Sequence, residues 1–276
     1  MNLNRFVKAI VLVSVIAFFA CNSFPYRNTN RDYKKQTKVL AQLIKLNPNL
    51  QTVEHLTKAS DWVGTTNFDL RKPNFVVIHH TAQNACEQTL RTFTMVQTKV
   101  SAHYVICKDG TIHHMLNDYL RAWHGGISKW GNNTDLNSSS IGIELDNNGF
   151  EPFDPAQINS LVLLLGELKK SYGIPDANFI GHSDIAPKRK VDPNVQFPWS
   201  LLASYGYGIW FNPNSTITLP ANMEVPYALA LIGYDIKDTA AAIHAFKRHF
   251  RQDSTALINT DDKSVMAQLI KYKLAK

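Results

Sequence analysis

Two histidine positions and one aspartate stand out in the sequence as groups that could bind a metal ion together. His182 and Asp192 lie ten residues apart, with a basic loop between them. Far upstream, the pair His79 and His80 follows an apolar run at 75–78. Two imidazoles and one carboxylate are the ligand set of a catalytic zinc site that keeps an open fourth position. If these three groups meet in the folded chain, the sequence predicts a metal-dependent hydrolase.

The same residues have plainer explanations when each is taken alone. A histidine that ends an apolar strand is more often structural, and a His–Asp pair at this spacing is more often a surface pair. Adjacent strand residues point to opposite faces of a sheet, so only one of His79 and His80 can face a given site, and periodicity does not say which. The turn at Ala186 and Pro187 lets the chain loop back so that both side chains can reach one ion, and the full motif with its basic run is more specific than the pair alone.

The elements that must position these groups alternate between strands and helices. The Asp109-Gly110 pair predicts a hairpin turn, and Asp154 predicts the start of a helix that Gly173 ends. The predicted strands are 75–79, 102–107, 111–115, 140–145 and 179–180, and the predicted helices are 33–46, 87–96, 155–172 and three in the last fifty residues. We therefore expect an α/β fold, in which a mixed central β-sheet is flanked by helices and followed by a small C-terminal three-helix domain.

The N-terminus has the pattern of an export signal. Arg5 and Lys8 precede an apolar run at 9–20, which suits a signal peptide and is too short to span a bilayer. A small residue directly before Cys21 resembles the lipoprotein box of bacteria, in which the cysteine is acylated. The alternative is a plain secretory signal with an incidental cysteine. In the lipoprotein interpretation, Asn22 favours the outer membrane, facing the periplasm.

Composition and charge narrow the partners of the chain. With 276 residues and a net charge of +7, it suits a polyanionic partner, an anionic membrane surface or an acidic cell-wall polymer. No block of five like charges occurs, so we expect no nucleic-acid partner. Export would allow Cys86 and Cys107 to pair, but a buried free thiol at Cys107 explains the sequence equally well.

Five motifs in a fixed order resemble one enzyme family. They are IHHTA at 78–82, SAHYVI at 101–106, RAWHGG at 121–126, IGIEL at 141–145 and GHSDIAP at 181–187. Together they are similar to the zinc-dependent type-2 N-acetylmuramoyl-L-alanine amidases, the family that includes phage amidases and the peptidoglycan recognition proteins. The resemblance spans roughly residues 70–210, and it implies that family's fold.

The resemblance implies a role for each residue of the site. It makes His79, rather than His80, a zinc ligand together with His182 and Asp192. It makes Glu144 the catalytic carboxylate and Lys190 the group that stabilises developing negative charge. General chemistry agrees, because a carboxylate can move the proton of the attacking water and a lysine can stabilise an oxyanion. The plain alternatives are a solvated carboxylate at a strand end and an ordinary surface lysine.

Four further residues are candidates for binding substrate. Trp123 and His124, before two glycines, could form an aromatic and polar wall on which a sugar ring stacks, or they could be a core tryptophan and a structural histidine. Arg121 could offer its guanidinium to a carboxylate of a peptide. We include His103, from the second motif, in the same group.

These observations lead to a domain plan and a function. We expect a signal peptide at 1–20, a lipidated tether and helix at 21–50, a zinc amidase domain at 51–212, a linker at 213–224 and a helical peptidoglycan-binding-like domain at 225–276. We expect a monomeric amidase, anchored to the membrane by its lipid, that cleaves muramic acid from L-alanine in peptidoglycan or muropeptides. The alternatives are a non-catalytic peptidoglycan-binding lipoprotein of the envelope and a structural lipoprotein that uses the C-terminal helices as a wall anchor.

Overall fold

The structure is a computed structural model that describes residues 25–46 and 63–275. The predicted signal peptide and Cys21 lie outside the described residues. The chain divides into two compact units, residues 1–68 and 69–276. In the first unit, helix α2 (Arg27–Ile44) begins six residues before the predicted start, and none of its residues is buried.

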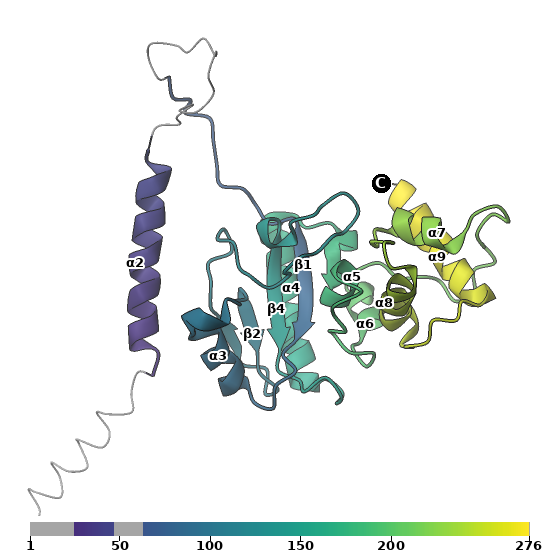
Figure 1. Cartoon of the computed structure of the whole chain (residues 1–276), viewed down its shortest axis with the longest axis horizontal. Coiled ribbons are helices and arrows are strands. Elements are labelled where there is room, and N and C mark those ends of the chain that lie inside the picture. The colour runs from purple at the N-terminus through teal and green to yellow at the C-terminus, as the bar shows by residue number, and fades with distance from the viewer. Residues whose placement is uncertain (1–24, 47–62, 276) are drawn as a thin grey trace, which may run out of the picture. The chain divides into compact units, whose positions relative to one another are not determined.

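The second unit is built on a five-stranded sheet (Figure 1). Its strands are β1 (Phe75–His80), β2 (Tyr104–Ile106), β3 (Ile112–His114), β4 (Ser140–Leu145) and β5 (Phe179–Gly181), in the order β3-β2-β4-β1-β5. β1 runs parallel to β4 and β5, and β2 runs parallel to β4. Only the predicted hairpin, β2 with β3, is antiparallel. The mixed sheet predicted from the sequence is therefore confirmed.

Helices follow β1, β4 and β5 in the chain. They are α3 (Cys86–Thr94), α4 (Pro155–Tyr172), α5 (His182–Ile185), α6 (Trp199–Ser204), α7 (Val225–Ile232), α8 (Thr239–Arg251) and α9 (Thr260–Leu274), with short 3-10 turns at Val96–Thr98, Leu136–Ser138 and Asp176–Asn178. α4 begins with Pro155 at its first turn and ends at Gly173, whose φ of 68° is in the left-handed region. Glycine adopts this conformation without the steric cost of a Cβ, so both signals in the sequence mark the true ends of the helix.

Two apolar cores form on the two sides of the sheet. On one side, Ile78 of β1 and Ile143 of β4 join Leu161 and Leu165 of α4. On the other side, alternation turns Val77 of β1 toward a second core, which is shared with α7, α8 and α9. The C-terminal helices therefore bury their apolar faces against the domain that carries the sheet. That they form a peptidoglycan-binding-like domain stays a prediction.

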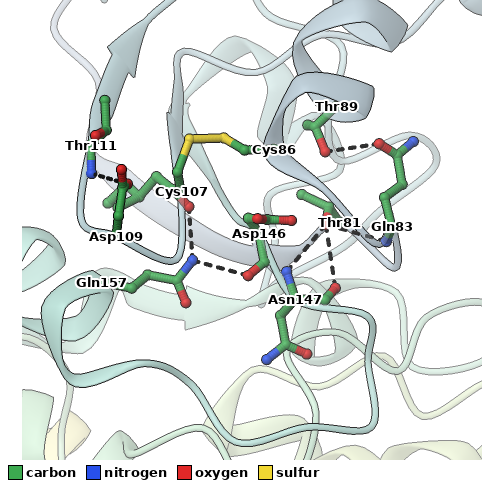
Figure 2. Close-up of a disulfide and its surroundings, with 11 residues drawn as sticks. Thr81, Gln83, Cys86, Thr89, Cys107, Asp109, Thr111, Asp146, Asn147 and Gln157 are labelled. Atoms are coloured by element: carbon green, nitrogen blue, oxygen red, sulfur yellow. Dashed lines mark hydrogen bonds between the residues drawn. A yellow bond between two sulfur atoms is a disulfide. The ribbon is translucent and has the colours of Figure 1, made fainter.

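A disulfide joins Cys86, the first residue of α3, to Cys107, just after β2, with 5.3 Å between the Cα atoms. Figure 2 shows the bridge and its surroundings, where Gln157 of α4 donates hydrogen bonds to the carbonyl oxygens of Ile106 and Asp146. These bonds tie α4 to the ends of β2 and β4. The disulfide decides the pairing of the two cysteines, which the sequence left open, and it fixes the first residue of α3 to the end of β2.

Across the described part of the chain, the helices are all too short or too polar to cross a membrane.

Candidate active site

The candidate site lies where the parallel strands end. His79 of β1 is the register partner of Glu144 of β4, so both side chains leave the same face of the sheet. β5 ends at Gly181, and His182 follows it directly as the first residue of α5. Ligand sites of open sheets with parallel strands form beyond the carboxyl ends of the strands. The sheet register therefore answers which histidine of the pair belongs to the site: it is His79.

Three ligand atoms from distant parts of the chain meet at this edge. Nδ1 of His79 lies 2.8 Å from Nδ1 of His182. Oδ2 of Asp192 lies 2.9 Å from the Nδ1 atom of His182 and 3.1 Å from that of His79. All three side chains are buried. Two imidazole nitrogens and a carboxylate oxygen form the donor set of a catalytic zinc site, so these residues suit that metal.

A second cluster of possible metal ligands occurs among the described residues, but two of its three members are joined in a disulfide. It consists of Cys86, Cys107 and His113. The two sulfur atoms are joined in the disulfide, and a metal needs free thiolates. This leaves His79, His182 and Asp192 as the metal site that the described residues offer.

The protonation of His79 and Asp192 suits metal binding. Burial, together with the neighbouring His182, lowers the pKa of His79 to about 4. Burial alone would disfavour a charged Asp192, but its close contacts with His182 and His79 hold the pKa of its carboxyl well below the usual range. At neutral pH the histidine is thus neutral and the aspartate ionised. These are the forms that bind a metal.

Glu144 lies beside the three ligands without joining them. Its Oε1 is 4.0 Å from Nδ1 of His79, and its buried Oε2 has no hydrogen-bond partner within the described residues. Burial, and next the charge of Asp192, raises the pKa of Glu144 to about 8. A carboxyl group whose pKa lies near neutrality and that has a free oxygen is suited to accept and return a proton.

Lys190 adds a positive charge to the wall of the same pocket. The pocket holds about 360 Å³, and Lys190 lines it together with Glu144 and the three metal-ligand candidates. The backbone N–H of Lys190 donates to the carbonyl of Ala186, which closes the turn after α5. The lysine thereby lies in the loop between His182 and Asp192, half-buried. Its charge is available to a substrate oxygen in the pocket.

A buried carboxylate holds the helix that carries His182. Asp184 accepts a hydrogen bond from the backbone N–H of Gly181 at 2.7 Å and one from the hydroxyl of Tyr234 at 2.9 Å. Nδ1 of His249, on α8, lies 2.7 Å from the same carboxylate. The C-terminal part of the chain therefore supplies two of the groups that hold α5 in place.

The residues predicted to bind substrate divide into two groups. Trp123 is half exposed and lines the pocket. His124 reaches the pocket too, but it is buried, and its Nδ1 is 3.0 Å from Nε2 of His79. Its ring is engaged with a metal-ligand candidate on one side and with Ser140 on the other. His124 thus contacts a metal-ligand candidate, and its predicted contact with substrate stays a prediction.

His103 and Arg121 use polar groups within the scaffold, and their predicted contact with substrate stays a prediction. His103 is fully buried, its Nδ1 accepts the N–H of Gly142, and its Nε2 lies 2.9 Å from the carbonyl oxygen of Leu120. Arg121 donates to Asp135 and Ser138. Neither residue lines the pocket, so both hold loops in place.

Sequence reasoning missed one wall of the pocket. Helix α3 contributes Thr89, Thr92 and Phe93, and the disulfide at Cys86 fixes the start of this helix. A short amphipathic helix carries no signal for which of its residues meets a distant site. Arg189, a neighbour of Lys190 in the basic loop, was a further omission, and its guanidinium donates to the carbonyl of Gly125 at the pocket.

Comparisons with known proteins point to one family. A family model described as N-acetylmuramoyl-L-alanine amidase matches residues 69–195. The amidase AmiD of Escherichia coli K12 is 36% identical over 210 residues, which cover 64% of this chain and 74% of AmiD. The 1,6-anhydro-N-acetylmuramyl-L-alanine amidase AmpD of Haemophilus influenzae is 42% identical over 104 residues, 37% of this chain and 56% of AmpD.

Solved structures show the same likeness over a longer stretch. A complex of Escherichia coli AmiD with anhydro-N-acetylmuramic acid-L-Ala-D-γ-Glu-L-Lys matches with a TM-score of 0.66 and 31% identity, covering 77% of this chain and 94% of that one. AmpDh3 of Pseudomonas aeruginosa matches with a TM-score of 0.67 and 27% identity, covering 80% of this chain and 100% of that one. The likeness extends beyond the region of the family model.

Proposed function

Since this chain belongs to the N-acetylmuramoyl-L-alanine amidase family, whose activity on peptidoglycan it shares, we propose that the activity depends on zinc held by His79, His182 and Asp192. The bond cleaved is the amide between the lactyl group of N-acetylmuramic acid and L-alanine of the stem peptide. The observation that supports this most directly is that two Nδ1 atoms and one carboxylate oxygen, all from residues that line one pocket, lie within 3.1 Å of one another.

The three ligands leave room for chemistry. Three protein ligands with a pocket beside them are typical of catalytic zinc sites, whereas structural sites use four. When bound, zinc supplies Lewis acidity, which lowers the pKa of water and polarises a carbonyl oxygen. The residues around the pocket then have to bind the substrate, move one proton and stabilise one developing negative charge.

Glu144 is our candidate for moving the proton. Its carboxyl ionises more readily when a dication neutralises the charge of Asp192 nearby, since that charge is one cause of its raised pKa. As a carboxylate, its free Oε2 accepts a proton from the attacking water. As an acid, it returns that proton to the amide nitrogen of L-alanine as the carbon–nitrogen bond breaks.

Lys190 and Trp123 are our candidates for the remaining tasks. Lys190 lines the pocket, and its ammonium group can stabilise the oxyanion formed when water attacks the amide carbon. The exposed face of Trp123 offers a stacking surface for a sugar ring. The wall formed by Thr89, Thr92 and Phe93 of α3 lies on the same pocket and would contact the substrate.

We also propose that the chain is exported and anchored by a lipid on Cys21. The support is the signal-like sequence at 1–20 and the disulfide between Cys86 and Cys107, because disulfides persist in oxidising compartments such as the periplasm. The lipid anchor would hold the amidase near its polymer.

The test is digestion of purified sacculi and defined muropeptides, with mass analysis of the products. We expect release of stem peptides that begin with L-alanine, loss of this release with a chelator, and its return on adding zinc. Full activity of metal-free protein, measured with the metal content in parallel, would contradict the zinc proposal. Binding of sacculi without cleavage by zinc-loaded protein would favour the non-catalytic alternative.

A further inference from the structure

The segment His124-Gly125 contacts both candidate zinc-ligand histidines on the side away from the ligand cluster. Nε2 of His79 lies 3.0 Å from Nδ1 of His124. Nε2 of His182 lies 3.2 Å from the carbonyl oxygen of Gly125. Two consecutive residues therefore meet the outer nitrogens of two histidines that are 103 positions apart in the sequence.

The position of the proton on His79 follows from a series of hydrogen bonds through His124 and Ser140. The series ends at the carbonyl of Leu136, which can only accept, so the hydroxyl of Ser140 donates to it. The oxygen of Ser140 then accepts from Nε2–H of His124. In a neutral imidazole the other nitrogen is an acceptor, so Nδ1 of His124 accepts from His79, whose proton must be on Nε2.

The position of the proton on His182 follows from a single hydrogen bond. The carbonyl oxygen of Gly125 can only accept, so His182 carries its proton on Nε2. Arg189 donates to the same oxygen at 3.0 Å, which holds the carbonyl in place. In both histidines Nδ1 is then left without a proton.

Both bare Nδ1 atoms face Oδ2 of Asp192 at about 3 Å. Three lone pairs at such distances repel one another unless a cation lies among them. The opposite tautomers would place protons between the same atoms and block the metal. We propose that His124 and the carbonyl of Gly125 are positioning groups that hold His79 and His182 in the tautomers that bind zinc. This inference rests on the proposed zinc dependence.

The segment is itself fixed by buried contacts. Oδ1 of Asn137 accepts the backbone N–H groups of both His124, at 3.1 Å, and Gly125, at 2.8 Å. The ring of His124 lies against Gly142 of β4, where a Cβ atom would come within 2.4 Å of it. The glycine of the IGIEL motif thus makes room for the histidine of the RAWHGG motif. This explains why two motifs distant in sequence serve one metal site.

The test compares zinc affinity, by competition with a chelator of known affinity, between His124→Phe, His124→Gln and wild type. Phenylalanine keeps a ring but accepts no hydrogen bond, so we expect a loss of roughly 10–100-fold in zinc affinity. Glutamine can accept from His79 and donate to Ser140, so it should restore part of the loss. Trp123→Phe, one residue away and in the pocket, is the matched control and should leave zinc affinity unchanged.

A second measurement does not depend on the variants folding. Nitrogen–proton NMR correlations of the histidine rings in full-length wild type, with and without zinc, should show protons on Nε2 of His79 and His182. Protons on Nδ1 in the metal-free protein, or unchanged zinc affinity in folded His124→Phe, would overturn the inference. Wild type that binds no zinc would overturn the proposed zinc dependence instead, and the metal-free tautomers would still be readable.

Discussion

The two halves of the candidate metal site are held by different means. His79 and Glu144 belong to β1 and β4, whose parallel pairing places them side by side. His182 and Asp192 flank a short helix and a loop, where the N–H of Ser183 donates to the carbonyl of Asp192. The first half, which we call the strand-held half, is thus positioned by a regular ladder of hydrogen bonds. The second, the loop-held half, depends on particular side chains around it.

The strongest of those side-chain contacts come from far along the chain. Asp184, fully buried beside His182, is bonded to Tyr234 and His249, which are 50 and 65 positions away. The ring of His249 also stacks on Trp199, with 3.9 Å between the centroids. A sequence that reads as a separate helical segment therefore takes part in holding a metal-ligand candidate. Substitutions in each half of the site test this difference.

The largest effect is expected from His182→Ala. Two ligands cannot hold the ion, so we expect loss of stoichiometric zinc and amidase activity at background. Metal analysis of the purified variant and mass analysis of muropeptide digests check both results. Chelator-resistant amidase activity in this variant would refute the site.

Glu144→Gln should separate chemistry from metal binding in the strand-held half. We expect bound zinc to be retained and kcat to fall by about 10²–10⁴-fold, because the proton carrier is lost. Zinc content and single-substrate kinetics are the measurements. A variant that loses its zinc would make Glu144 a ligand instead of a proton carrier.

The strand-held half should also make the metal-free protein sensitive to pH. The pKa of Glu144 is raised from 4.5 to about 8, so the folded state binds more protons than the unfolded state between these values. The stability that Glu144 contributes as an acid is present below pH 4.5 and is lost as pH rises through 8. Relative to metal-free wild type, Glu144→Gln should gain up to about 1.4 kcal/mol for each pH unit in this window. Denaturant unfolding at several pH values measures this, and parallel curves for the two proteins would contradict it.

His249→Ala should produce the smallest effect, on the loop-held half. It removes a partner of buried Asp184, so we expect unfolding to become easier by about 1–3 kcal/mol and zinc to bind less tightly. His244→Ala, on the same helix, where the ring contacts the carbonyl of Ser254, is the matched control. Chelator competition and denaturant unfolding are the measurements. Lower stability with unchanged zinc affinity would show that the C-terminal helices support the fold without affecting the site.

Much of the fold and the ligand set was predictable from the sequence, because those signals are local. Alternation and apolar runs predicted β1 and β4, and Asp154 with Gly173 predicted the ends of α4. The motifs predicted the residues that meet at the edge of the sheet. Regular elements and short motifs carry their information within a few residues, so they can be recognised without the fold.

Tertiary structure alone decided the roles that depend on distant partners. The sheet register placed His79 beside Glu144, and the fold paired Cys86 with Cys107. His103 and His124, alike in sequence as candidates for substrate, became a scaffold residue and a partner of His79 only through atoms brought to them by folding. A histidine ring carries the same two nitrogens everywhere, and its role is set by the donors and acceptors that surround it.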